Sequence, residues 1–255
     1  MGVLAALALV GVWLLRGTVQ LMTFRDPFVP LSEDVSFLLF DLFWGTVWMA
    51  QGTLVLLLVP AFAFARRPLD VEGTGGTSPG RIAAWWRVAG MLTLAIVASL
   101  SLSSHAMGVE SGRPLIVTAD ALHLLAAGSW IGSLTMILTV GRRGGRPAYA
   151  AQIRSFSPVA VVSVTMLTVM GTVLAWTHLV TVSDLWTGIY GRVLSAKVLA
   201  ACAVFALGLL NWRRGLPALD TDAGAATVQR RAAFEVSVAV GVLLLTAVLV
   251  HSPKP

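Results

Sequence analysis

The sequence predicts an all-α fold, a polytopic transmembrane helical bundle with about seven spans. The first observation is the composition: 57% of the 255 residues are hydrophobic and 12% are charged, whereas a soluble domain carries about 25% charged residues. The second is that the apolar residues form continuous runs of about 20 residues, the length that a helix needs to cross a bilayer. Continuous runs favour helices over the alternating strands of a membrane barrel, and a helix satisfies its own backbone hydrogen bonds in lipid.

Seven apolar segments are predicted to be the spanning helices, and together they make residues 1–255 a single transmembrane domain. The first segment lacks the basic start and the cleavage site of a signal peptide, so we expect it to be retained as a helix. The linkers 66–81 and 213–231 are polar and too short for a separate domain. The predicted helices are, in order, roughly 2–24, 37–65, 82–104, 115–140, 156–180, 188–211 and 232–251.

The basic residues of the connections predict how the bundle is oriented. One set of connections carries most of them, while the other carries only Arg25 and Arg113, with Lys254 in the tail. Cytoplasmic loops are enriched in Lys and Arg, so we expect a cytoplasmic N-terminus and a C-terminus outside. The net charge of +6 then reflects orientation and indicates no nucleic-acid partner. The cytoplasmic set comprises Arg66, Arg67, Arg81, Arg142, Arg143, Arg146, Arg154, Arg213, Arg214, Arg230 and Arg231.

Two short patterns occur twice along the chain. Gly17-Thr18-Val19 recurs as Gly171-Thr172-Val173, and Trp44-Gly45-x-Val47-x-x-Ala50-Gln51 recurs as Tyr190-Gly191-x-Val193-x-x-Ala196-Lys197. Such recurrence is typical of the internal repeats of transporters. Chance similarity between apolar segments explains it equally well, so both interpretations stay open.

Polar and metal-capable side chains crowd together only in the stretch 104–132. They are His105, Met107, Glu110, Asp120 and His123. The predicted orientation puts this stretch at the outer face, together with the other two histidines of the chain, His178 and His251. The sequence therefore predicts a vestibule at the outer face.

The residue types in this stretch favour copper. Asp120 and His123 are three residues apart and share a helical face, where a carboxylate can orient an imidazole ligand; Asp120 could also bind metal itself or relay protons. The alternative is a helix-capping Asp beside a structural histidine. Imidazole and thioether, as in His105 and Met107, suit copper better than zinc or magnesium, although a lone Met is also common apolar filler. His178 is a further candidate ligand or an interfacial residue.

Four other polar residues fall inside predicted helices. Arg16 and Asp41 lie at similar depth, so we expect that they could pair. Lys197 and Glu235 form either a structural ion pair or a step in a cation or proton path. We find no phosphate-binding loop, no zinc-protease motif, no paired cysteines and no nucleophile triad, so the protein is not expected to be an enzyme.

At these residues the sequence resembles the copper-resistance protein D (CopD) family of bacterial membrane proteins. The first two matching stretches are Ser103-Ser104-His105-Ala106 and the pattern Asp120-x-x-His123-x-x-Ala126-x-x-x-Trp130-x-Gly132. Two later stretches fit as well, Tyr190-Gly191-Arg192-Val193-Leu194-Ser195-Ala196-Lys197 with Asn211, and Arg230-Arg231 leading into Glu235. Family members often have an additional N-terminal helix, so we expect either a shortened start or seven spans.

The resemblance implies a multi-pass protein of the bacterial inner membrane that imports copper ions, as Cu(I) or Cu(II), from a periplasmic copper-binding partner. It makes His105, Asp120 and His123 the leading ligand candidates, with Met107 or His178 completing the site, and it adds weight to Lys197 and Glu235. Two alternatives remain. One is a haem-binding electron-transfer bundle with histidine axial ligands. The other is a membrane partner that hands copper on without conducting it.

Overall fold

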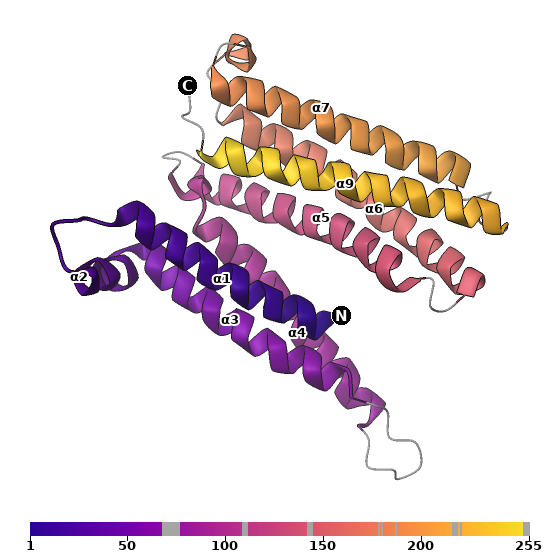
Figure 1. The fold of residues 1–255 in the computed structure, drawn as a ribbon, viewed down its shortest axis with the longest axis horizontal. Helices are drawn as coiled ribbons and strands as arrows, with labels where there is room; N and C mark the ends of the chain where they lie inside the picture. Colours follow the sequence, from indigo (N-terminus) through magenta and orange to yellow (C-terminus); the bar gives the residue numbers. More distant parts are fainter. Residues whose placement is uncertain are drawn as a thin grey trace. The chain divides into compact units, whose positions relative to one another are not determined.

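The chain is all-helical in the computed structural model, which describes residues 1–67, 77–108, 112–141, 145–177, 179, 181–186, 188–215, 219 and 221–251 (Figure 1). Within these residues, 7 helices are long and apolar enough to cross a membrane. The prediction of a polytopic α-helical membrane bundle is therefore confirmed. The spanning helices are α1 (Gly2–Phe24), α3 (Phe43–Ala65), α4 (Pro79–Leu102), α5 (Arg113–Val140), α6 (Gly145–Trp176), α7 (Ile189–Leu210) and α9 (Asp222–His251).

Short helices fill the connections between the spans. They are α2 (Leu31–Ser36), the π-helical turns η1 (Phe37–Asp41) and η5 (Asn211–Gly215), and the 3-10 turns η2 (His105–Gly108) and η4 (Val182–Leu185). The predicted helix 37–65 is interrupted, because Leu42 has extended backbone angles between η1 and α3. Helices α6 and α9 begin well before the predicted positions 156 and 232. Hydropathy marks only the apolar part of a helix, and alanine-rich polar turns extend both helices beyond it.

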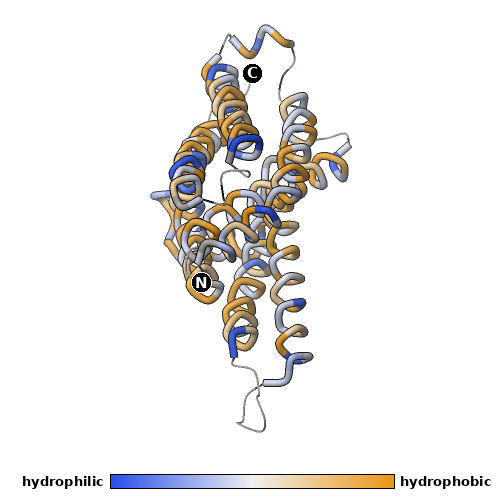
Figure 2. The backbone as a smooth tube through the Cα atoms, turned by 90° about the vertical axis from the view of Figure 1, so that its right-hand side faces the viewer, coloured by the Kyte–Doolittle hydropathy of each residue, from blue (hydrophilic) through white to orange (hydrophobic). Residues whose placement is uncertain are grey.

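Large apolar side chains cover the outside of the helices, as expected for a protein surrounded by lipid. Met22 is 73% exposed, Leu15 63% and Leu244 64%. Figure 2 shows that the long helices are coloured mostly as hydrophobic, with isolated hydrophilic positions. The polar positions inside the spans are therefore few, and each one needs a partner within the bundle.

The chain divides into two compact units, Met1–Ala121 and Leu122–Pro255, called here the N-terminal and C-terminal units. The single-domain expectation for residues 1–255 stays a prediction. In the N-terminal unit, α1, α3 and α4 pack around the buried residues Ala6, Val55, Leu58, Ala61, Ala89 and Ile96. The C-terminal unit has two buried clusters, Ile137–Tyr149–Ala150–Leu219–Val228 and Tyr190–Leu194–Leu249.

Helices α1 and α3 approach closely through a reciprocal pair of tryptophans. The rings of Trp13 and Trp48 stack at 4.4 Å, and each indole N–H donates to the other residue's carbonyl oxygen, at 2.9 and 3.1 Å. A Cβ on Gly17 would lie 2.5 Å from the Trp48 ring, and one on Gly52 would lie 2.2 Å from the Trp13 ring. The two glycines make room for the rings, which is how small residues allow membrane helices to pack.

The recurring sequence pattern coincides with a recurring backbone contact. Gly45 is the third residue of α3, and a Cβ there would lie 2.1 Å from the carbonyl oxygen of Leu38. Gly191 is the third residue of α7, and a Cβ there would lie 1.8 Å from the carbonyl oxygen of Asp184. Leu38 and Asp184 are separated by the same sequence interval as Gly45 and Gly191. Helices α3 and α7 therefore both begin with the same tight turn. Shared apolar composition alone does not explain this similarity.

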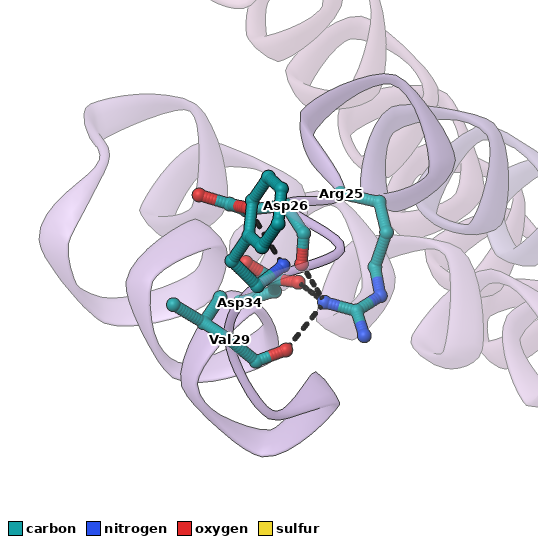
Figure 3. Close-up of polar contacts among 5 residues, drawn as sticks. Arg25, Asp26, Val29 and Asp34 are labelled. Atoms are coloured by element: carbon teal, nitrogen blue, oxygen red, sulfur yellow. Dashed lines mark hydrogen bonds and ion pairs between the residues drawn. The ribbon is translucent and has the colours of Figure 1, made fainter.

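The connection between α1 and α2 is closed by Arg25 (Figure 3). Its Nη1 donates to the carbonyl oxygen of Val29 at 2.8 Å, to that of Asp26 and to the carboxylate of Asp34. The Asp26 carboxylate in turn accepts from the backbone N–H of Phe28 at 2.9 Å. The Arg25–Asp34 ion pair holds α2 against the end of α1.

Candidate metal site at the end of α4

A polar network inside the N-terminal unit holds the last turn of α4. Arg16 donates from Nη1 to Gln51 Oε1 at 2.9 Å, and from Nη2 to Ser103 Oγ at 2.8 Å and its carbonyl oxygen at 3.2 Å. Gln51 Nε2 donates to Ser103 Oγ at 3.1 Å. The Arg16 guanidinium also lies 5.6 Å from the centre of the Trp44 ring. Three helices are thus joined at Ser103, the residue that ends α4.

The expected Arg16–Asp41 pair is wrong. Asp41 is exposed in η1, whereas Arg16 points to Gln51 and Ser103. A charged side chain inside a membrane helix is costly unless it finds partners. Here three neutral acceptors and an aromatic face stabilise the guanidinium without a carboxylate.

The next residue of the chain connects this network to α5. Ser104 Oγ donates to Asp120 Oδ2 at 2.9 Å, and the carbonyl oxygen of Ser104 accepts from the backbone N–H of Met107 at 3.2 Å. The turn η2, which begins at His105, therefore follows a residue that is bonded to Asp120. The structure thus connects Asp120, through Ser104, to the start of the turn that carries His105 and Met107. Asp120 and Met107 are partly buried.

His123 lies in the next turn of α5 and is half-buried. A glycine of α6 faces it: a Cβ on Gly171 would lie 3.2 Å from His123 Cε1 and 3.5 Å from Nδ1. Sequence reasoning singled out Gly171 only as part of a recurring tripeptide. Its position against the imidazole was not foreseen, because sequence spacing does not reveal which helices face each other.

Several predicted ligands fall outside what the structure describes. Glu110 and His178 are not among the described residues, and the side chains of His105 and His251 are not described either. Among the side chains that are described, no group of three His, Cys, Asp or Glu is close enough to hold a metal ion. The ligand set His105, Met107, Asp120, His123 and His178 therefore stays a prediction.

A second polar pair lies inside the C-terminal unit. Glu235 of α9 is 4% exposed, and its Oε1 accepts from Asn211 Nδ2 at 2.6 Å. Sequence reasoning considered Lys197 as the companion of Glu235, and Asn211 was noted only as the end of a helix. One sequence feature could have indicated Asn211 as a partner: its amide follows directly after an apolar run, where a helix leaves the lipid core.

The fold and these two polar clusters define a multi-pass α-helical membrane protein with buried polar side chains in an apolar bundle. Residues 150–249 match the family model of CopD, Copper resistance protein D, and this match supports the chain's membership of the CopD family. It confirms the resemblance over these residues and links the chain to membrane proteins of copper resistance or homeostasis. The matched range runs from α6 to near the end of α9. No curated protein and no solved structure matches the chain.

Proposed function

We propose that the protein takes up copper across the bacterial inner membrane, with copper docking at the outer face. Copper is the substrate, and the docking residues are His105, Met107, Asp120 and His123, with His178 as a further ligand. The observation that carries the proposal is the hydrogen bond from Ser104 to Asp120, which fixes a carboxylate beside the His105 turn. The CopD match supports copper as the metal.

The orientation rests on the positions of the arginines. In the N-terminal unit, Arg66 and Arg67 follow α3 and Arg81 lies in the first turn of α4, at the end opposite Ser103. Because positive charge marks the cytoplasmic side, Ser103 and the His105 turn belong to the outer face. The same rule puts the N-terminus in the cytoplasm and the C-terminus outside.

The proposed docking residues have different roles because their side chains differ in chemistry. Imidazole nitrogens bind either copper oxidation state, and the thioether of Met107 favours Cu(I). Asp120 acts as a ligand or as the group that orients His123, one helical turn along α5. A periplasmic copper-binding protein is the proposed source of the metal. Lys197 and Glu235 offer no soft ligand, so any step that they contribute moves a proton or a hard cation.

The purified protein tests the docking site directly. Loaded with copper and washed, it is expected to retain bound copper, whereas the double variant His105→Ala/His123→Ala is expected to lose it because both imidazoles are gone. Metal analysis by mass spectrometry measures the copper-to-protein ratio, with Met91→Ala, a lipid-facing change in α4, as control. Equal copper in the double variant and the control would overturn the site.

Replacing Ser104 by Ala tests the hydrogen bond from Ser104 to Asp120, on which the proposal depends. Removing the donor to Asp120 is expected to weaken copper binding by about 10–100-fold, the usual effect of removing a group that orients a metal ligand. A competition titration with a copper chelator measures the affinity. The matched control is Thr118→Ala, which removes an exposed α5 hydroxyl bonded only to the Pro114 carbonyl. If Ser104→Ala binds copper as tightly as the control does, Asp120 takes no part in the site.

A further inference from the structure

The C-terminal unit has a partly open cavity of about 230 Å³ between α5, α6, α7 and α9. Its walls are mainly aromatic and aliphatic. Trp130 comes from α5, Tyr149 and Phe156 from α6, Phe205 from α7 and Trp212 from η5. Trp130 and Phe205 meet edge to face at 5.7 Å. Glu235 and Asn211 bring polar atoms into this apolar space.

The Glu235 carboxylate has one oxygen that is satisfied and one that is not. Oε1 accepts the hydrogen bond from Asn211 at 2.6 Å. No described residue donates to Oε2, and a Cβ on Gly208 of α7 would lie 3.9 Å from it. A carboxylate is costly in an apolar interior unless donors or positive charge compensate it. Glu235 Oε2 is therefore an available hydrogen-bond acceptor, and Gly208 beside it places no side chain in the cavity.

Asn211 contributes a second acceptor. Its bond from Nδ2 to a carboxylate oxygen decides the orientation of the amide, because the opposite orientation would bring two oxygens together. Oδ1 is then buried with no hydrogen-bond partner among the described residues. Asn211 is the first residue of the π-helical turn η5, and such turns are frequent at functional sites. Asn211 and Glu235 both line the cavity, but Asn211 Oδ1 has almost no accessible surface, so Glu235 Oε2 is the acceptor that a ligand can reach.

The lining selects against metal ions. Among the described residues that line the cavity there is no His, Met or Cys, so copper lacks the nitrogen and sulfur ligands that it prefers. Glu235 is the single carboxylate among the described lining residues, and the hydroxyls of Ser157 and Thr165 are bonded to their own helix. Such mostly apolar walls do not suit a hard cation with six or more oxygen ligands. A ligand that carries N–H donors, a positive charge and an apolar body suits this cavity. Its N–H groups can donate to the carboxylate, its charge compensates that of Glu235, and its body packs against aromatic faces, which also attract cations.

We propose that this cavity binds a primary alkylammonium or arylalkylammonium ion, with its ammonium group at Glu235 and its apolar body among the aromatic walls. The ammonium donates to Glu235 Oε2, the carboxylate oxygen to which no described residue donates, while Asn211 holds Oε1 in place. This site is separate from the copper-docking residues and does not depend on the copper proposal. The same chemistry occurs in free amines and in the headgroup of phosphatidylethanolamine.

Binding of phenethylammonium to the full chain in phosphatidylglycerol nanodiscs tests the site. Isothermal titration calorimetry is expected to show saturable binding of one ligand per chain. Glu235→Gln should weaken it at least tenfold, because the isosteric amide removes the charge. The neutral isostere 2-phenylethanol should also bind at least tenfold more weakly. Equal affinity of the alcohol, or unchanged affinity in Glu235→Gln, would show a merely apolar pocket and overturn the proposal.

A second variant covers the case in which Glu235→Gln does not fold. Gly208→Val puts a side chain into the cavity beside Oε2 while it keeps Glu235 and Asn211, and it should abolish binding. Its matched control is Gly90→Val in α4, where a Cβ meets nothing within 4 Å; this control should bind normally. Unchanged binding by Gly208→Val would also overturn the proposal. Adding phosphatidylethanolamine distinguishes the sources: competition with phenethylammonium assigns the site to a lipid headgroup, and no competition assigns it to a free amine.

Discussion

His123→Ala is expected to abolish copper-dependent accumulation in cells that depend on this protein for copper uptake. His123 is the only histidine whose ring is described within a spanning helix, and Asp120 precedes it by one helical turn of α5. Truncation removes the imidazole that is proposed as a nitrogen ligand of copper. The loss is therefore expected to exceed that of Ser104→Ala, which leaves every proposed ligand in place.

Cellular copper measured by mass spectrometry gives the result, normalised to the amount of protein in the membrane. Met136→Ala, an exposed position further along α5, is the matched control for truncation in this helix. Gly171→Val provides an independent check, because its side chain would press on the imidazole, which already lies 3.2 Å from the Cβ position. Accumulation by His123→Ala at the level of Met136→Ala would remove His123 from the proposed path.

Gly191→Ala is expected to disrupt folding of the C-terminal unit more than Ala at any other glycine that the structure describes in this unit. The new Cβ would lie 1.8 Å from the carbonyl oxygen of Asp184 and 2.8 Å from its carbonyl carbon. These are backbone atoms, so η4 has to move away from α7. Overpacking typically costs about 1–3 kcal/mol even where side chains can yield, and a rigid backbone contact is expected to cost at least as much.

Thermal unfolding of the purified protein and its yield in the membrane measure this effect. The matched control is Gly241→Ala in α9, where a Cβ meets nothing within 4 Å; there Ala should be neutral or slightly stabilising, since it favours helix. Gly45→Ala should behave like Gly191→Ala, because its Cβ would lie 2.1 Å from the Leu38 carbonyl oxygen. If Gly191→Ala unfolds at the same temperature as Gly241→Ala, the tight turn is not required.

The spanning helices could be predicted because hydropathy is a property of each residue and needs no knowledge of its neighbours in space. The first helix matches its predicted bounds, 2–24, residue for residue. The starts of α6 and α9 were missed because polar helical turns precede the apolar run in both helices. The break at Leu42 was missed because η1 is as apolar as the helix that follows it.

The candidate site was predicted only in part. Asp120 and His123 could be grouped because a helix brings residues three apart onto one face. That Ser104 bonds Asp120, and that Gly171 faces His123, depends on contacts between different helices. The expected Arg16–Asp41 pair failed for the same reason: similar depth along two helices does not say which side of each helix faces the other.

The sequence by itself determined the number of apolar spans, the resemblance to the CopD family and the residue types suited to copper, because these follow from composition and from the order of side chains along the chain. Only the tertiary structure decided the partners: Ser103 for Arg16, Asn211 for Glu235, and a glycine against a carbonyl at the start of both α3 and α7. In an apolar bundle a polar atom must find its partner within the protein. That partner is chosen by how helices rotate and cross, which the order of residues along one helix does not specify.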